Sequence, residues 1–185
     1  LPAGGLYNLS ATVVDNASPT PNPVPGVSVT FVVEPNATTG AGTTVSNIVG
    51  TTDVNGVVNA TFNANTAAGG FTERAVVSGV SAPGATPDSA TLTNLAGTAA
   101  ALQIVSGNNQ SQVVSGTFST PLVVRTVDAF GNVVTTPSTS VTFTAPLSGA
   151  SATIIGSPDV TDTNGEASVT AVANAGAGSY QVTAT

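Results

Sequence analysis

One turn sequence occurs twice in this chain, and its two copies constrain the fold more than any other feature. The first copy is Asp53-Val54-Asn55-Gly56, and the second is Asp162-Thr163-Asn164-Gly165, 109 residues later. An Asn-Gly pair between alternating apolar residues favours a type I′ hairpin turn, in which both central residues take a positive φ. The sequence therefore predicts a strand, a tight turn and a return strand at each place, with Asn55-Gly56 and Asn164-Gly165 as the structural turn residues.

The residues around the two turns keep the same spacing. Before the turns, Leu9, Ala11 and Val13 match Leu122, Val124 and Thr126 at an offset of 113 residues. After the turns, four predicted inward positions match at an offset of 109: Val58, Ala60, Phe62 and Ala64 with Ala167, Val169, Ala171 and Ala173. Agreement in register indicates homologous repeats. The predicted domains are residues 1–97 and 98–185.

Apolar residues alternate with polar ones along the whole chain, and turn signals recur about every ten residues. The hydrophobic fraction is 41% and comes mostly from Val and Ala, a composition that suits strands better than helices. The expected fold is all-β, with two tandem Ig-like antiparallel β-sandwiches.

Charge and composition exclude several classes of function. The net charge is -7, and Arg74 and Arg125 are the only positive side chains, so no nucleic-acid partner is expected. The chain has no Cys and no His, which removes thiol catalysis, Cys/His zinc sites and His acid–base chemistry. Its apolar runs are all shorter than the roughly 20 residues that cross a bilayer, so no transmembrane segment is expected.

A corner follows the second turn. Asn174, Gly178 and Tyr180 have the spacing of the corner that leads into strand F of Ig-like sandwiches. In that corner a Tyr hydroxyl bonds to backbone a few residues upstream. The first copy has Phe71 in the place of Tyr180. Phe71 is therefore expected to fill the same place in the core without making that bond.

Glu73 departs from the apolar pattern of the repeat. It falls where the second copy has Val182. Charged side chains are rarely buried without a partner. We therefore expect Glu73 at the rim of the sandwich, or paired with Arg74 or with solvent.

The second copy carries most of a recognisable pattern. Its residues are Pro121-Leu122-Val123-Val124, Val127-Asp128-x-x-Gly131-Asn132, Val141-Thr142-Phe143, Thr161-Asp162-x-Asn164-Gly165 and Ala173-Asn174…Tyr180-x-Val182-x-Ala184. With these residues the chain resembles the bacterial Ig-like domains of group 1, the repeats of invasin- and intimin-type surface proteins. The resemblance implies an extracellular or bacterial cell-surface rod, spacer or adhesive stalk, and it brings no catalytic residues.

The alignment of the two copies leaves a strand unmatched at each end of the chain. Ala90 and Leu92 begin a last strand of the first copy that has no match after Tyr180, and residues 100–120 have no counterpart before Leu6. The first domain is thus expected to lack its opening strand, and the second its closing strand. Two explanations stay open. The chain is a fragment of a longer repeat array, or a neighbouring molecule supplies the missing strand, as in donor-strand filaments.

Asp15, Asp128, Asp159 and Asp162 are candidate calcium ligands. They lie near predicted strand ends, where loops could gather the oxygen ligands that calcium prefers. The competing interpretation is that Asp fills turns because its carboxylate bonds to nearby backbone amides. The acids do not have EF-hand spacing, and no cofactor is expected, with calcium as the one candidate.

Asn-x-Ser/Thr sequons give a second set of candidates. Five occur, about as many as chance predicts, so their number is no evidence for glycosylation. The sequons in predicted loops, at Asn16, Asn36 and Asn109, are the most accessible candidates.

Enzyme activity is not expected. Glu34, Glu73 and Glu166 are isolated in the sequence, and the chain has no Trp and few other aromatic residues to form a sugar-binding cleft. The expected role is structural: a stalk, spacer or filament/sheath subunit whose partners are neighbouring copies, with strand complementation between chains as one form of assembly. The alternative is an adhesive binding module for a host receptor or glycan.

Overall fold

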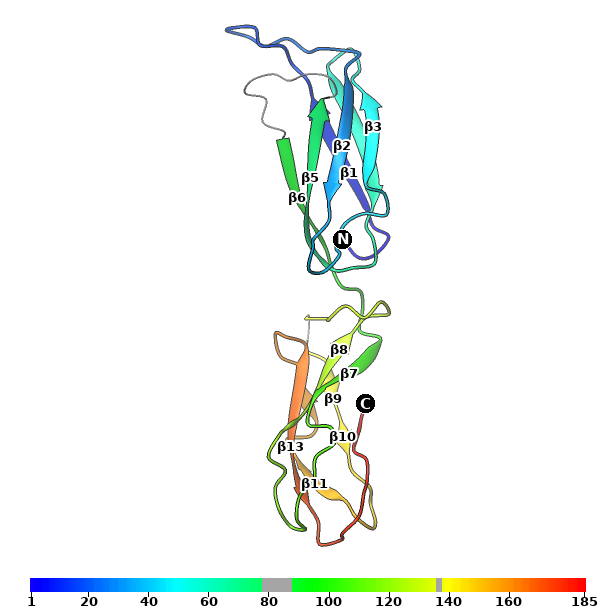
Figure 1. Ribbon diagram of the computed structural model, residues 1–185, viewed down its shortest axis with the longest axis vertical. Helices are drawn as coiled ribbons and strands as arrows, with labels where there is room; N and C mark the ends of the chain where they lie inside the picture. Colours follow the sequence, from blue (N-terminus) through cyan, green and yellow to red (C-terminus); the bar gives the residue numbers. More distant parts are fainter. Residues whose placement is uncertain (78–87, 136–137) are drawn as a thin grey trace. The chain divides into compact units, whose positions relative to one another are not determined.

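The computed structural model describes residues 1–77, 88–135 and 138–185 of the chain (Figure 1). The chain divides into two compact units, Leu1–Ala96 and Gly97–Thr185. Strands and loops make up the described residues, which confirms the all-β prediction. These residues contain no helix that is long and apolar enough to cross a membrane. The sequence also predicts a loop at residues 78–88, and except for Asp88 this loop lies outside the described part of the chain.

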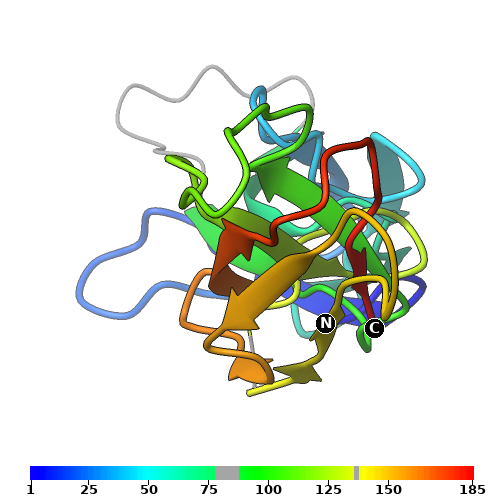
Figure 2. The same ribbon diagram turned by 90° about the horizontal axis from the view of Figure 1, so that it is seen from below.

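The first unit is a sandwich of two antiparallel sheets. The smaller sheet pairs β1 (Leu6–Thr12) with β4 (Val57–Asn63). The larger has the order β3-β2-β5-β6, formed by Asn47–Thr51, Ser28–Glu34, Gly69–Val77 and Asp88–Asn94. A long loop between β1 and β2 projects from the strands (Figures 1 and 2).

Alternating side chains of both sheets fill the core of the first unit. The buried apolar residues are Tyr7, Val29, Phe31, Val33, Ala41, Val58, Ala60, Phe62, Ala64 and Phe71. Phe31 meets Phe62 edge to face, with ring centroids 6.3 Å apart. Phe71 meets Tyr7 in the same way at 5.6 Å. The predicted core position of Phe71 is therefore correct, and aromatic pairs of this geometry add to the stability that burial supplies.

The second unit repeats this plan with a different distribution of strands. One sheet has the order β11-β13-β8-β7, formed by Ala152–Ile155, Glu166–Ala173, Leu122–Val127 and Ala101–Ser106. The opposite side holds two short pairs, β12 (Asp159–Val160) with β9 (Ser140–Val141), and β10 (Phe143–Thr144) with β14 (Thr183–Ala184). The buried apolar residues of the main core cluster are Val124, Val141, Phe143, Ala167 and Val169.

The register of strand pairing is the same in both units. Leu9 pairs with Ala60 in the first unit, and their counterparts Leu122 and Val169 pair in the second. The same holds at the next edge, where the bridge of Thr43 to Ala64 corresponds to the pair Ala152 and Ala173. The sequence repeat is therefore a repeat of backbone pairing as well.

The two Asp-x-Asn-Gly turns are not hairpins, and this prediction is wrong. The first turn leads from β3, which pairs with β2, to β4, which pairs with β1. The second leads from β12, which pairs with β9, to β13, which pairs with β8 and β11. Each turn therefore carries the chain from one sheet to the other.

The turn geometry also differs from type I′. Gly56 and Gly165 have φ of 72° and 73°, but neither Asn55 nor Asn164 has a positive φ. The carboxylate of the preceding Asp explains the difference. Asp53 Oδ1 accepts the backbone N–H groups of Asn55 at 2.8 Å and of Val57 at 2.9 Å. This Asx-type turn holds the chain in a form that needs only one left-handed residue.

Candidate functional site

Glu73 is the most unusual side chain of the first unit. It is 2% exposed, and neither carboxylate oxygen has a hydrogen-bond partner within the described residues. Burial in this apolar setting raises the pKa of Glu73 to about 7. The expectation that Glu73 lies at the rim or pairs with Arg74 is wrong. Successive residues of a strand point to opposite faces, and Arg74 pairs instead with Glu34, with 2.6 Å between Nη2 and Oε1.

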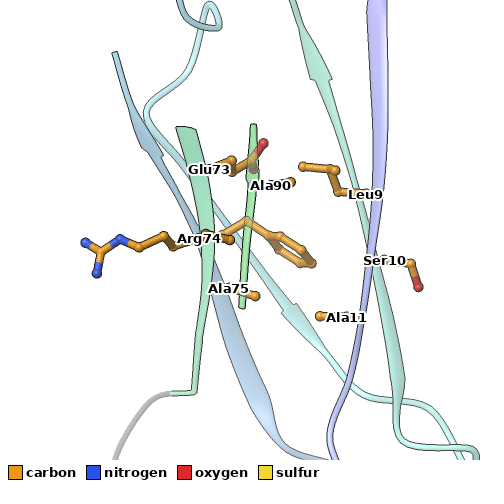
Figure 3. A pocket seen from close by; sticks show the side chains of 9 residues that line it. Leu9, Ser10, Ala11, Glu73, Arg74, Ala75 and Ala90 are labelled. Carbon is orange, nitrogen blue, oxygen red and sulfur yellow. The ribbon is translucent and has the colours of Figure 1, made fainter. Parts of the chain in front are cut away.

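A cavity of about 110 Å³ lies beside Glu73. We call it the Glu73 groove; its lining consists of Leu9, Ser10 and Ala11 of β1, Phe31 of β2, Glu73, Arg74 and Ala75 of β5, and Ser89 and Ala90 of β6. Figure 3 shows the side chains of Glu73, Ala90 and Leu9 pointing toward one another, while Arg74 points away. The groove therefore lies where β1 of one sheet faces β5 and β6 of the other.

The second unit shows what occupies the equivalent place there. Strand β7 pairs with β8, the counterpart of β1. Leu102 of β7 and Val182, the counterpart of Glu73, both pack against the core cluster of the second unit. In the first unit, β1 pairs with β4 alone among the described strands. The Glu73 groove thus lies on the side of β1 that corresponds to the side of β8 covered by β7.

The four calcium candidates lie on separate turns and strand ends, and their carboxylates accept backbone amides. Asp15 accepts from Ala17 and Asn22, and Asp162 accepts from Asn164 and Glu166. These bonds are a cause of the lowered pKa of both carboxyls. Groups of three or more acidic side chains that could hold a metal ion are absent from the described residues. Calcium binding stays a prediction.

Among the four candidates, the Asp128 carboxylate accepts the most hydrogen bonds. Burial raises its pKa, but hydrogen bonds from the Asn132 side chain and from the amides of Gly97, Asn132 and Phe130 outweigh this and lower the pKa to about 2. The Gly97 amide lies 2.8 Å from Asp128 Oδ2, so this carboxylate fixes the first residue of the second unit. Asp159 differs, because its Oδ2 accepts a strand amide, that of Ser168, at 2.7 Å.

Two Asn side chains make the corners that follow β4 and β13. Asn65 donates to the Gly40 carbonyl at 2.8 Å, and its counterpart Asn174 donates to the Gly149 carbonyl at the same distance. Each Asn also accepts backbone amides through Oδ1. Asn174 therefore forms a corner at the position that its spacing in the sequence predicts.

The predicted Tyr180 corner bond is absent. The Tyr180 hydroxyl is buried and has no hydrogen-bond partner in the described part of the chain. A buried hydrogen bond from a Tyr hydroxyl does form in the first unit, at Tyr7, where the sequence does not predict it. The Tyr7 hydroxyl lies 2.6 Å from the Thr93 carbonyl oxygen and 2.9 Å from Asn94 Oδ1. An isolated Tyr near the start of a strand carries no sequence signal for such a bond.

The glycosylation candidates differ in how free their side-chain amides are. Asn16 and Asn109 are exposed. Asn36 is half-buried, and its Nδ2 donates to the Gly70 carbonyl at 2.9 Å while Oδ1 accepts the amides of Thr38 and Thr39. A sugar on Asn36 would have to break this arrangement, so Asn16 and Asn109 stay the more accessible candidates.

Among solved structures, this chain is similar to an adhesin and an invasin. FdeC, an Escherichia coli adhesin, has 23% sequence identity and a TM-score of 0.48, and the match covers 100% of this chain and 55% of that chain. Invasin, a bacterial integrin-binding protein, has 23% identity and a TM-score of 0.41, covering 99% of this chain and 33% of that chain. The chain thus spans about half and a third of these proteins. No family model matches it, and no curated protein does.

Proposed function

We propose that the two units are structural repeat modules of a bacterial extracellular or cell-surface protein, and that they act as stalk, spacer or filament/sheath subunits. The observation that carries this proposal is the repetition of one Ig-like unit in register. Leu9 and Ala60 pair as Leu122 and Val169 do. A unit copied with its pairing intact extends a protein, since each copy adds a sandwich with the same register between its central strands.

The surface of the first unit supports contact with similar chains. The outer face of β1 and β4 is mostly polar, with the apolar Leu6 and Val57 as exceptions. Its short uncharged polar side chains are all exposed: Asn8, Ser10, Thr12, Asn59, Thr61 and Asn63. Such a face neither repels a copy of itself by charge nor needs a charged partner. The free edge of β1 among the described strands is compatible with strand complementation between chains.

Electron microscopy of the native material tests the proposal. A filament or sheath subunit gives regular polymers, and a stalk or spacer gives isolated rods. A glycan array and a cell-binding assay with the 185-residue chain test the adhesive alternative. Specific binding in either assay would favour that alternative, and images of compact particles alone would contradict the structural role.

A further inference from the structure

We propose that the Glu73 groove receives an extended strand from a partner chain, and that this strand places a Lys or Arg side chain against the Glu73 carboxylate. The inference deepens the strand complementation proposed above and rests on it. It adds the register of the incoming strand and the chemistry of its central residue.

Strand pairing in the second unit indicates how an incoming strand would pair with β1. There β7 pairs antiparallel with β8, with Leu102 opposite Thr126 and Ile104 opposite Val124. The counterparts of Thr126 and Val124 are Val13 and Ala11, at the offset of 113 residues. A strand bound in the same way would pair with β1 near Ala11, a residue that lines the Glu73 groove. Main-chain hydrogen bonds to a free strand edge are the usual source of affinity in such additions.

The Glu73 carboxylate determines which side chain the incoming strand needs. In the second unit the equivalent position holds Val182, which packs against the core cluster, as Leu102 of β7 also does. An incoming strand with an apolar residue at this point would bury the Glu73 carboxylate further and leave it unpaired, which costs binding free energy while the carboxylate stays ionised. A Lys or Arg side chain removes that cost, because its stem packs on Leu9 and Ala90 while its charge meets the carboxylate.

None of the positive charges within the described residues is placed to meet Glu73. The sequence contains no Lys, and its two Arg side chains have other contacts. Arg74 pairs with Glu34 on the outer face of the sheet, and Arg125 Nε donates to Gln103 Oε1 at 2.9 Å. The amino group of Leu1 bonds to the Thr93 carbonyl at 2.7 Å. The partner is therefore a protein segment that alternates apolar and polar residues and carries one basic residue facing inward.

The test uses the full chain with a strand tethered before Leu1 by a flexible Gly/Ser linker of about ten residues, which raises the effective concentration of a weak strand. The tethered strand is the sequence of Ala101–Ser106, either unchanged or with Lys at the position of Ile104. Both versions are also made with Glu73→Val. Amide exchange of β1 and the pKa of Glu73 are measured by NMR in each protein.

We expect the Lys strand to slow exchange at Ala11 and its neighbours by at least about tenfold at pH 8, and to lower the pKa of Glu73 by about 1–3. The unchanged strand should protect β1 less at this pH, and this order should reverse with Glu73→Val. Equal protection by both strands, or a Lys preference that survives Glu73→Val, overturns the inference and leaves strand complementation standing. Protection by neither strand overturns both, whereas the structural role itself is judged by electron microscopy.

Discussion

Glu73 of the first unit holds the position that Val182 holds in the second, 109 residues later, and both side chains meet apolar surroundings. Val182 packs against a core cluster, whereas the Glu73 carboxylate is 2% exposed without a hydrogen-bond partner in the described residues. The first unit therefore buries an unpaired carboxylate at a position where the second unit has an apolar side chain.

Replacing this acid should stabilise the first unit. We expect Glu73→Val to raise its free energy of unfolding at pH 8 by about 2–4 kcal/mol, because the variant removes an unpaired buried carboxylate and adds apolar contact. Urea unfolding followed through amide signals of the first unit measures this. Glu34→Gln is the control; it breaks a half-exposed ion pair and should cost less than about 1 kcal/mol. A loss of stability in Glu73→Val would contradict this account.

The stability of the first unit should fall as pH rises. The pKa of Glu73 is raised from 4.5 to about 7 in the folded state. Below pH 4.5 the Glu73 carboxyl is protonated in both states, and this group does not reduce stability. Between pH 4.5 and about 7 only the unfolded chain ionises, so stability falls by about 3 kcal/mol and then stays level. Urea midpoints across this range test the sign, and Glu73→Gln should abolish the slope.

Asp128 should act in the opposite direction on the second unit. Its pKa is lowered from 3.8 to about 2, so its contribution is present above pH 3.8 and is lost as pH falls toward 2. Asp128→Ala should destabilise the second unit by about 1–3 kcal/mol at pH 7, because four hydrogen bonds to the carboxylate are lost. Thermal unfolding at pH 7 and pH 2.5 measures both effects. The exposed counterpart variant, Asp15→Ala, should cost the first unit less.

The turn glycines should tolerate no side chain. A Cβ on Gly56, whose φ is 72°, would lie 2.5 Å from the Val13 carbonyl oxygen. We expect Gly56→Ala to cost more than about 2 kcal/mol, from a left-handed residue and a steric clash together. Gly26 separates the two causes, since its φ is 75° but a Cβ there meets nothing within 4 Å. Gly26→Ala should cost about 1 kcal/mol, and equal losses in denaturant unfolding would show that the close contact is unimportant.

Asn94 should be the most sensitive polar residue of the first unit. It is 2% exposed, and its Nδ2 donates to the Gly42 carbonyl at 2.8 Å, with Asn65 Oδ1 and the Ala67 carbonyl at 3.0 and 3.1 Å. We expect Asn94→Ala to destabilise the unit by about 2–4 kcal/mol, because these acceptors and the Tyr7 hydroxyl lose a partner. The control Asn63→Ala changes an exposed residue and should stay within about 0.5 kcal/mol. A similar loss in both variants would contradict the role of Asn94.

Features that depend on local alternation could be predicted from the sequence. Val58, Ala60, Phe62 and Ala64 were placed inward and are buried, as are three of their four counterparts in the second unit. A strand that has one face in a core must alternate, whatever its neighbours are. The repeat could also be predicted from the sequence, because equivalent residues of the two copies keep the same spacing and pair with equivalent residues.

Features that depend on which strands meet needed the tertiary structure. Asn55-Gly56 reads as a hairpin turn, yet it leads from β3 to β4 in the opposite sheet. The burial of Glu73 likewise depends on which strands pack around it. The sequence shows a charge at an apolar position, but only the packing of β1 and β6 around Glu73 shows that its side chain is almost fully buried and that Arg74 pairs with Glu34 instead.

The sequence by itself therefore determined an all-β chain of two in-register repeats, with the inward faces of β4 and β13 and the positions of both turns. The tertiary structure alone decided that the turns cross between sheets, that Tyr7 rather than Tyr180 makes the buried bond, and that Glu73 lies unpaired beside a groove. The physical reason is the range of the interactions. Side-chain alternation and turn chemistry act within a few residues, whereas strand partnership and desolvation depend on residues that are distant in the chain.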